Sequence, residues 1–217
     1  MSNQKTPSDN ASAPQEAFDS TAYWRRRYRR GGTSGSGSYG RLAVYKAQVV
    51  NELVAKKGLR SMIEHGCGDG NQAALFDVET YTGMDVSPHA IRACREKFLD
   101  RVDWSFHSIT FLEHLAAHDA ALSLDVIYHL VEDETFEEYM TRIFASARRY
   151  VLIYSTDEEI ASGAPHVRHR AYSKWIAINA PNWTLIHTYN HPYPRRNGDD
   201  GENTALATFK LFTLADS

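Results

Sequence analysis

The residues that suggest chemistry are three glycines and four acids in the middle of the chain. The glycines alternate within the stretch "EHGCGDGNQ": Gly66, Gly68 and Gly70. The acids precede, interrupt or follow this turn: Glu64, Asp69, Asp85 and Asp125. Glycines directly after a strand let the backbone approach a ligand closely. Because acids surround the turn, it would repel a pyrophosphate and suit a cationic ligand that carries an amine and a ribose.

A dinucleotide-binding turn is the alternative for glycines in this position. That fingerprint requires G-x-G-x-x-G, with a pyrophosphate at the N-terminus of the next helix. Here the third glycine comes one position early, and Asn71 stands where the fingerprint needs glycine. The spacing and the acids therefore argue against a dehydrogenase. A tight turn without a ligand is the structural alternative for the glycines, and a surface acid before a helix is the alternative for Asp85.

Alternating strands and helices must position these residues. Apolar runs predict strands at 60–66, 80–85, 102–108, 120–130, 150–155, 183–190 and 204–214. Helical periodicity and capping signals predict helices at 41–58, 71–77, 87–100, 133–149 and 170–179. We expect Ser87 and Asp133 to be N-caps and Gly58 to end the first of these helices. The alternation predicts a mostly parallel sheet with helices on both faces, with ligands bound beyond the carboxyl ends of its strands.

The stretch E-x-G-x-G-x-G resembles motif I of the class I SAM-dependent methyltransferases. "YTGMDVS" resembles the next motif of that family, and "SLDVIYHLVEDETF" its fourth-strand motif. The resemblance covers roughly residues 41–214. It implies a Rossmann-like seven-stranded α/β sheet, mostly parallel with an antiparallel final strand, and S-adenosyl-L-methionine (SAM) as cofactor. The residues that it places around the cofactor are Glu64, Gly66, Cys67, Gly68, Gly70, Asp85, Val86, Ile109 and Asp125.

One departure from the family concerns the third strand. Many members carry an acid just after it, whereas this chain has "HSITF". Contacts with the adenine are therefore expected from the backbone and from Ile109.

Three residues near the end of the fourth strand are the predicted catalytic residues: Asp125, Tyr128 and His129. Placing an acceptor on the axis of an in-line displacement supplies much of the rate of methyl transfer. His129 is the predicted base for a hydroxyl acceptor, because histidine titrates near neutrality. A packing histidine is the alternative, and Asp125 either contacts the methionine end of the cofactor or orients the acceptor.

The predicted organisation has three parts: a disordered tail at 1–20, a lid loop and helix at 21–58, and the SAM-binding core at 59–217. The tail is polar and has little to bury. The stretch "YWRRRYRRGGTSGSGSYG" is either a lid, a flexible linker or an RGG-like RNA contact. Its aromatic residues favour a lid, with backbone N–H groups or Arg27 meeting the cofactor carboxylate.

Composition excludes several other classes of protein. The net charge of −3 argues against a protein that binds duplex nucleic acid. No apolar run resembles a membrane span or a signal peptide, so we expect a cytoplasmic protein. The two cysteines suggest neither a disulfide framework nor a metal site. The histidine pairs 166/169 and 114/118 lack the ligand set of a zinc site, so no metal is expected.

The acceptor is the least defined part of the reaction. Segments after the fifth strand mix Arg and His with Tyr and Trp, which suit a sugar, an aromatic or an anionic acceptor. The chain is also similar to methyltransferases found with surface-glycan and natural-product genes. We therefore predict O-methylation of a small molecule or glycan. The alternatives are N-methylation of RNA or protein, which the lack of an (N/D)-P-P-(Y/F) loop argues against, and a non-catalytic SAM-binding partner subunit.

Overall fold

A computed structural model describes residues 18–196, 199 and 203–215. Its centre is a seven-stranded sheet with the strand order β3-β2-β1-β4-β5-β7-β6. The strands are β1 (Ser61–His65), β2 (Thr80–Asp85), β3 (Trp104–Ser108), β4 (His118–Leu124), β5 (Ala147–Ser155), β6 (Trp183–Thr188) and β7 (Thr208–Leu214). Pairing is parallel from β3 to β5, whereas β7 runs antiparallel to both β5 and β6. The predicted fold class is confirmed.

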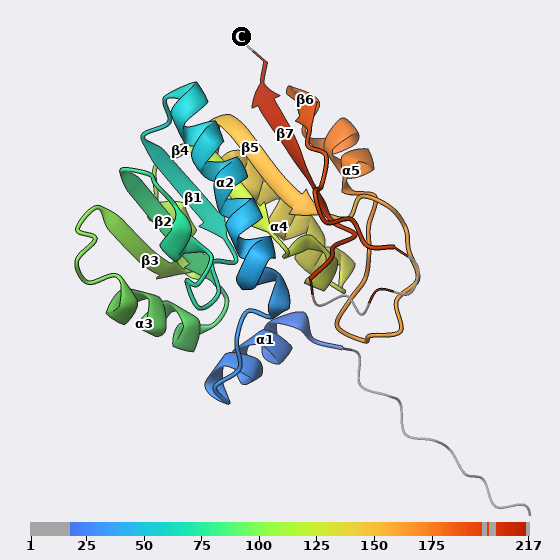
Figure 1. Cartoon of the computed structure of the whole chain (residues 1–217), viewed down its shortest axis with the longest axis horizontal. Helices are drawn as coiled ribbons and strands as arrows, with labels where there is room; N and C mark the ends of the chain where they lie inside the picture. Colours follow the sequence, from blue (N-terminus) through green and yellow to red (C-terminus); the bar gives the residue numbers. More distant parts are fainter. Residues whose placement is uncertain (1–17, 197–198, 200–202, 216–217) are drawn as a thin grey trace, which may run out of the picture.

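Helices cover both faces of this sheet (Figure 1). They are α2 (Gly40–Lys57), α3 (Pro88–Lys97), α4 (Asp133–Ala145) and α5 (Tyr172–Asn179), whereas α1 (Ser20–Arg29) lies elsewhere. The side chains of α2 and α3 enter one apolar core with one face of the sheet, and those of α4 and α5 enter a second core on the opposite face. Strands covered on both sides bury side chains on both faces, as with the fully buried Met62 and Ile63 of β1.

The capping signals were partly right. Gly58 ends α2 in the left-handed conformation (φ 59°), and its N–H donates to the Val54 carbonyl. The Ser87 side chain accepts from the Ala90 N–H at 3.4 Å at the start of α3. Asp133 is not a cap: Glu132 holds that position without a side-chain cap bond, and Asp133 is the first helical residue.

The helix predicted at 71–77 is wrong. The structure has only a short 3₁₀ turn there, Ala73–Leu75, and Phe76 is extended. Tertiary bonds hold this segment instead, since Asn71 Nδ2 donates to the Ser38 carbonyl at 2.7 Å and Gln72 Nε2 to the Ala43 carbonyl at 3.0 Å.

The N-terminal segment contains a helix that the sequence pattern did not predict. Residues 1–17 of the expected tail lie outside the described residues, and Ser20 begins α1. This helix lies beyond the carboxyl ends of the parallel strands, apart from the helices that cover the sheet faces (Figure 1). The segment before α2 is thus positioned at the edge where a ligand is expected.

Candidate active site

The glycine turn after β1 approaches its neighbours too closely for side chains. Gly66, Gly68 and Gly70 all have positive φ angles, between 55° and 88°. A Cβ on Gly66 would lie 2.5 Å from Val126 Cγ2, and one on Gly68 would collide with the Ser34 hydroxyl. The turn therefore adopts a glycine-specific conformation, and part of the space that its glycines leave is filled by the N-terminal segment.

Two buried acids flank the turn. Glu64 is 2% exposed and Asp85 is 6% exposed. Burial raises the pKa of Glu64 to about 7, although the Tyr81 hydroxyl donates to it. Burial also raises the pKa of Asp85 to about 6, while the N–H groups of Ser87 (2.8 Å) and Gly68 (3.0 Å) donate to its carboxylate. Both acids are held in a place where a positively charged ligand would stabilise their ionised forms.

Asp69 differs from the other acids because it bonds to the N-terminal segment. Its carboxylate accepts from the Ser34 N–H at 2.9 Å and from the Tyr39 hydroxyl at 2.8 Å, and the Ser34 hydroxyl accepts from the Asp69 N–H at 3.1 Å. At the other end of the segment, the Arg25 Nε–H donates to the Val86 carbonyl at 2.9 Å. These bonds attach the N-terminal segment to the loops after β1 and β2.

Asp125 follows β4 and is held by a buried lysine that sequence reasoning missed. It is the only non-glycine residue with positive φ (60°) among the described residues. Lys46 Nζ, fully buried on α2, lies 2.5 Å from Asp125 Oδ2, and the Tyr128 hydroxyl donates to Oδ1 at 2.6 Å. The sequence did contain a sign of this buried lysine, because Lys46 lies on the apolar face of α2, four residues after Leu42 and three before Val49.

His129 is held as a neutral ring by a hydrogen bond at Nδ1. Its Nδ1 lies 3.0 Å from the His166 carbonyl and donates to it, which leaves the lone pair on Nε2. Burial lowers the pKa of His129 to about 4, so the ring is uncharged at neutral pH. The Trp24 ring meets it edge-on at 4.9 Å. If His129 acts as a base, it accepts the proton at Nε2.

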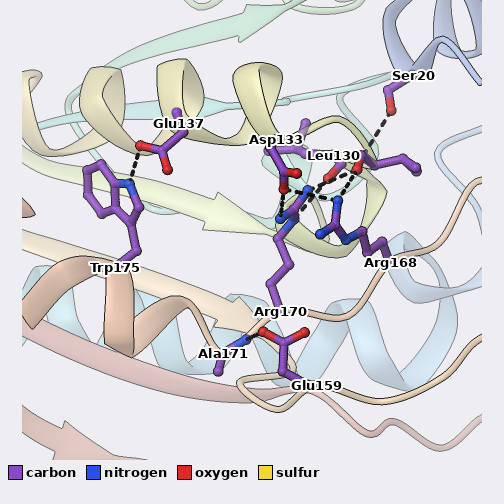
Figure 2. Close-up of polar contacts among 10 residues, drawn as sticks. Ser20, Leu130, Asp133, Glu137, Glu159, Arg168, Arg170, Ala171 and Trp175 are labelled. Carbon is purple, nitrogen blue, oxygen red and sulfur yellow. Dashed lines mark hydrogen bonds and ion pairs between the residues drawn. The ribbon is translucent and has the colours of Figure 1, made fainter. Parts of the chain in front are cut away.

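The segment that carries His166 is fixed to the start of α4 by two arginines (Figure 2). Arg170 donates to the carbonyls of Leu130 (3.2 Å) and Val131 (2.9 Å) and pairs with Asp133 at 2.6 Å. Arg168 donates to the Val131 carbonyl at 2.9 Å. The same turn reaches α1, where the Val131 N–H donates to the Ser20 hydroxyl at 3.1 Å.

Two cavities meet at this site. The first contains seven of the nine predicted cofactor residues: Glu64, Gly66, Cys67, Asp85, Val86, Ile109 and Asp125. The second lies between α1 and the segments that follow β5 and β6, has a volume of about 450 Å³, and contains Tyr128 and Arg27. Four residues line both cavities: Trp24, Ser34, Asp125 and His129. The arrangement suits two ligands that react where the cavities join.

Some predicted residues lie behind the cavities. Gly68 and Gly70 do not line the first cavity: Gly68 faces Ser34 and Tyr28, and Gly70 faces Phe98 and Cys94. Trp24, Tyr28 and Ser34, which also line this cavity, belong to the stretch that the sequence assigned to a lid. Lining residues that the sequence did not suggest are Ser20, Thr135, Glu138, Tyr139 and Arg142. Among the described residues, no group of three or more His, Cys, Asp or Glu is placed to hold a metal ion.

Comparisons with known proteins show which proteins the chain resembles. Residues 62–149 match the family model described as "Methyltransferase domain". The fold is similar to that of the N-methyltransferase NodS from Bradyrhizobium japonicum, solved with S-adenosyl-L-homocysteine (SAH): TM-score 0.69, 13% identity, 92% of this chain and 100% of that chain. It is also similar to magnesium protoporphyrin IX methyltransferase from Synechocystis with bound SAH: TM-score 0.61, 14% identity, 92% and 97% covered.

A third similar structure is the methyltransferase domain of a bacterial Hen1, with TM-score 0.60, 18% identity, and 79% and 97% covered. No curated protein sequence matches the chain significantly. Residues 62–149 therefore resemble a methyltransferase domain, and the chain shares the fold of these solved methyltransferases. In the part of the chain that the structure describes, no helix is long and apolar enough to cross a membrane.

Proposed function

We propose that the protein transfers a methyl group from SAM, held in the first cavity, to an oxygen of a small molecule held in the second. The observation that carries this proposal is that the two cavities share Asp125 and His129. A small acceptor is favoured because the second cavity, at about 450 Å³, has the size of a small-molecule pocket.

The first cavity fits the cofactor chemically. Its buried acids, Glu64 and Asp85, have pKa values that burial raises to about 7 and about 6, so a cationic ligand would compensate them. The Gln72 Oε1 atom, from a residue lining this cavity, is buried with no hydrogen-bond partner in the structure. Asp85 and Val86 would hold the ribose side, Ile109 the adenine, and Glu64 and Gly66 the methionine side.

The reaction assigns distinct tasks to the residues at the junction. Bound SAM supplies a methyl group that is already activated for displacement. His129 Nε2 would accept the hydroxyl proton as the oxygen gains the methyl group. Tyr128 and Lys46 would keep the Asp125 carboxylate fixed, since both are bonded to it. Trp24 and the rest of α1 would exclude water from the junction.

His129→Gln is the direct test. The variant keeps a polar side chain but loses the base, so we expect kcat to fall about 100-fold or more with an active hydroxyl acceptor. Affinity for SAH, measured by calorimetry, is expected to change less than about threefold. His89→Gln, on the exposed side of α3, is the matched control and should behave as wild type. An unchanged kcat in His129→Gln would contradict the proposal and favour an amine acceptor that needs no base.

The competing proposal is a polyanionic acceptor such as RNA, and the arginines of α1 favour it. Arg25, Arg26 and Arg29 of the helix are exposed, as is Arg30 directly after it. A polymer bound through such charges would lose affinity steeply as salt rises. Neutralising Arg26, Arg29 and Arg30 together would then abolish binding, whereas methylation of a small acceptor would be unaffected by that change.

A further inference from the structure

Tyr154, near the end of β5, lines the second cavity, and the proposed reaction gives it no task. The Asp125 N–H donates to the Tyr154 carbonyl at 3.0 Å. The Lys46 ammonium lies 5.3 Å from the centre of the Tyr154 ring, and the residue is only 1% exposed. A buried phenol is therefore placed next to the ion pair of Lys46 with Asp125, where the two cavities join.

His191, in the segment after β6, is bonded to the Tyr154 hydroxyl. The Tyr193 N–H donates to His191 Nδ1 at 2.9 Å, so Nδ1 carries a lone pair. Burial lowers the pKa of His191, although the charge of Asp125 acts in the other direction, so the ring is uncharged at neutral pH. The single ring proton is consequently on Nε2, which lies 2.7 Å from the Tyr154 hydroxyl oxygen and donates to it.

The Tyr154 hydroxyl therefore directs its own proton away from His191. Its oxygen is the acceptor of that bond, and the described residues offer the hydroxyl no other hydrogen-bond partner. Burial raises the pKa of Tyr154 and the charge of Asp125 adds to this, so the phenol keeps its proton and is a donor rather than a base. Because buried donors are normally hydrogen-bonded, the free donor indicates a ligand in the second cavity that accepts from Tyr154.

The hydroxyl of Thr204 is an independent sign of a polar ligand in the same cavity. Thr204 lines the second cavity, and its Oγ1 is buried without a hydrogen-bond partner among the described residues. The chain around Thr204 is attached to the segment that carries His191, because the Ala205 N–H donates to the Tyr193 carbonyl at 3.0 Å. Two hydroxyls of one cavity, those of Tyr154 and Thr204, thus have hydrogen-bonding capacity that the described part of the chain does not use.

The surroundings of Tyr154 limit the kind of oxygen that it can bind. Burial and the Asp125 carboxylate both disfavour a negative charge on the Tyr154 hydroxyl. An anionic oxygen bonded to this hydroxyl would meet the same desolvation and the same field. An uncharged oxygen, in a hydroxyl or a carbonyl group, would not be repelled.

We propose that Tyr154, oriented by His191, selects acceptors that carry a second, uncharged oxygen near the hydroxyl that is methylated. This oxygen, in a hydroxyl or carbonyl group, accepts a hydrogen bond from Tyr154, and Thr204 binds the acceptor from the neighbouring segment. The inference rests on the proposed function for the direction of the methylated hydroxyl toward His129, whereas the contact with Tyr154 does not. Tyr154 is thus a specificity-determining residue, and His191 is a positioning residue that acts through it.

The first experiment measures this contact without turnover. The protein is saturated with SAH to fill the first cavity, and calorimetry at neutral pH gives its affinity for three probes with one ring system. The probes are a dihydroxynaphthalene with adjacent hydroxyls, the naphthol that lacks one of them, and the hydroxynaphthoate with a carboxylate in its place. Wild type should bind the diol about five- to tenfold more tightly than the naphthol, which is the effect of one hydrogen bond, and should bind the hydroxynaphthoate no more tightly than the naphthol.

Variants assign this preference to the Tyr154 hydroxyl. Tyr154→Phe removes only that group, so the preference for the diol over the naphthol should fall below about twofold. Thr204→Val should weaken the preference in part. Tyr150→Phe, on the same strand and outside both cavities, is the matched control and should keep it. Equal affinities of wild type for diol and naphthol, tighter binding of the hydroxynaphthoate, or an equal loss in Tyr150→Phe would overturn the inference.

The second experiment tests the positioning role of His191 with the same probes. His191→Gln keeps a donor for Tyr154 and an acceptor for the Tyr193 N–H, so it should retain much of the preference, whereas His191→Phe should lose it. Equal changes in the affinities for diol and naphthol would show a purely structural role and contradict the positioning. A preference for the diol with an unaltered kcat in His129→Gln would support the contact with Tyr154 and contradict the proposed base. A lowered kcat in His129→Gln without this preference would overturn the inference and leave the proposed function standing.

Discussion

At the scale of single residues, the junction of the two cavities depends on a buried ion pair. Lys46 is fully buried on α2, and its ammonium contacts the carboxylate of Asp125, the residue at the junction of the cavities. Asp125 also has an unfavourable left-handed backbone (φ 60°), so its side chain and backbone are fixed by their surroundings. A lysine in the core is tolerated here because its charge is matched where the reaction is proposed to occur.

Removing this lysine should destabilise the protein strongly. Lys46→Met leaves a largely buried carboxylate without its partner, and we expect a loss of about 3 kcal/mol in the free energy of unfolding, measured in urea. Lys46→Met combined with Asp125→Asn should cost clearly less than the sum of the single changes. Lys56→Met, at an exposed ion pair with Glu52 on the same helix, should cost less than about 1 kcal/mol. Equal losses at both lysines would show that Lys46 only fills space.

At the scale of elements, the acceptor side of the site depends on the segment between β5 and α5. This segment carries His166, whose carbonyl orients His129, and Arg170, whose side chain holds the segment against the start of α4. Arg170 is 8% exposed and its guanidinium lies 4.6 Å from the centre of the Phe136 ring. Arg170, four residues after His166, thus helps to set the orientation of the proposed base His129.

Arg170→Gln should affect the acceptor side of the site and leave the cofactor side nearly unchanged. It leaves the buried carbonyls of Leu130 and Val131 short of donors, and we expect a loss of about 2 kcal/mol in the free energy of unfolding. Because Arg170 does not line the first cavity, SAH affinity should stay within about threefold of wild type, whereas kcat should fall as His129 loses its fixed orientation. Arg168→Gln, with 45% of its side chain exposed, should have a smaller effect on both quantities. A fall in SAH affinity as large as the fall in kcat would argue against this division.

The strands were predictable because the central ones are covered on both faces, and those such as β4 and β5 carry long apolar runs. The helix α1 was not, because its four arginines obscure a contact face made by aromatic side chains such as Trp24 and Tyr28. The false helix at 71–77 has a related cause: its polar side chains bond to α2 and to the loop before it, which a local pattern does not reveal.

The residues of the site also divide into those that the sequence could predict and those that it could not. The positions of Glu64, Gly66 and Asp85 at the first cavity were predictable, because they follow from spacing along β1 and β2. The His166 carbonyl that orients His129 was not, since any residue type offers a backbone carbonyl and only the course of the loop brings it there. Lys46 lay between these extremes, being a charged residue on an apolar helix face.

At the scale of the whole molecule, the buried titratable groups of the site couple cofactor binding to pH. Glu64 and Asp85 have folded-state pKa values raised to about 7 and about 6 by burial. The folded protein therefore binds more protons than the unfolded chain, and these two acids lower stability as pH rises from about 4 to 7. The pKa values of His65 and His129 are lowered by burial, to about 3 and about 4, so these rings contribute stability that is present above about pH 6.5 and is lost as pH falls toward 4. In the free protein the two effects oppose each other across this range.

Cofactor binding should remove the contribution of the two acids to the pH dependence of stability and leave the contribution of the histidines. A bound cation favours ionised Glu64 and Asp85, so their pKa values fall and the complex no longer loses stability as pH rises. We expect the rise in Tm on saturation with SAM to grow steadily from pH 5 to pH 7.5, and less steeply with SAH, which lacks the sulfonium charge. Asp85→Asn together with Glu64→Gln should flatten this dependence, whereas Asp77→Asn, at an exposed acid outside both cavities, should leave it intact. A Tm shift independent of pH in wild type would mean that the cationic part of the cofactor does not lie beside these two acids.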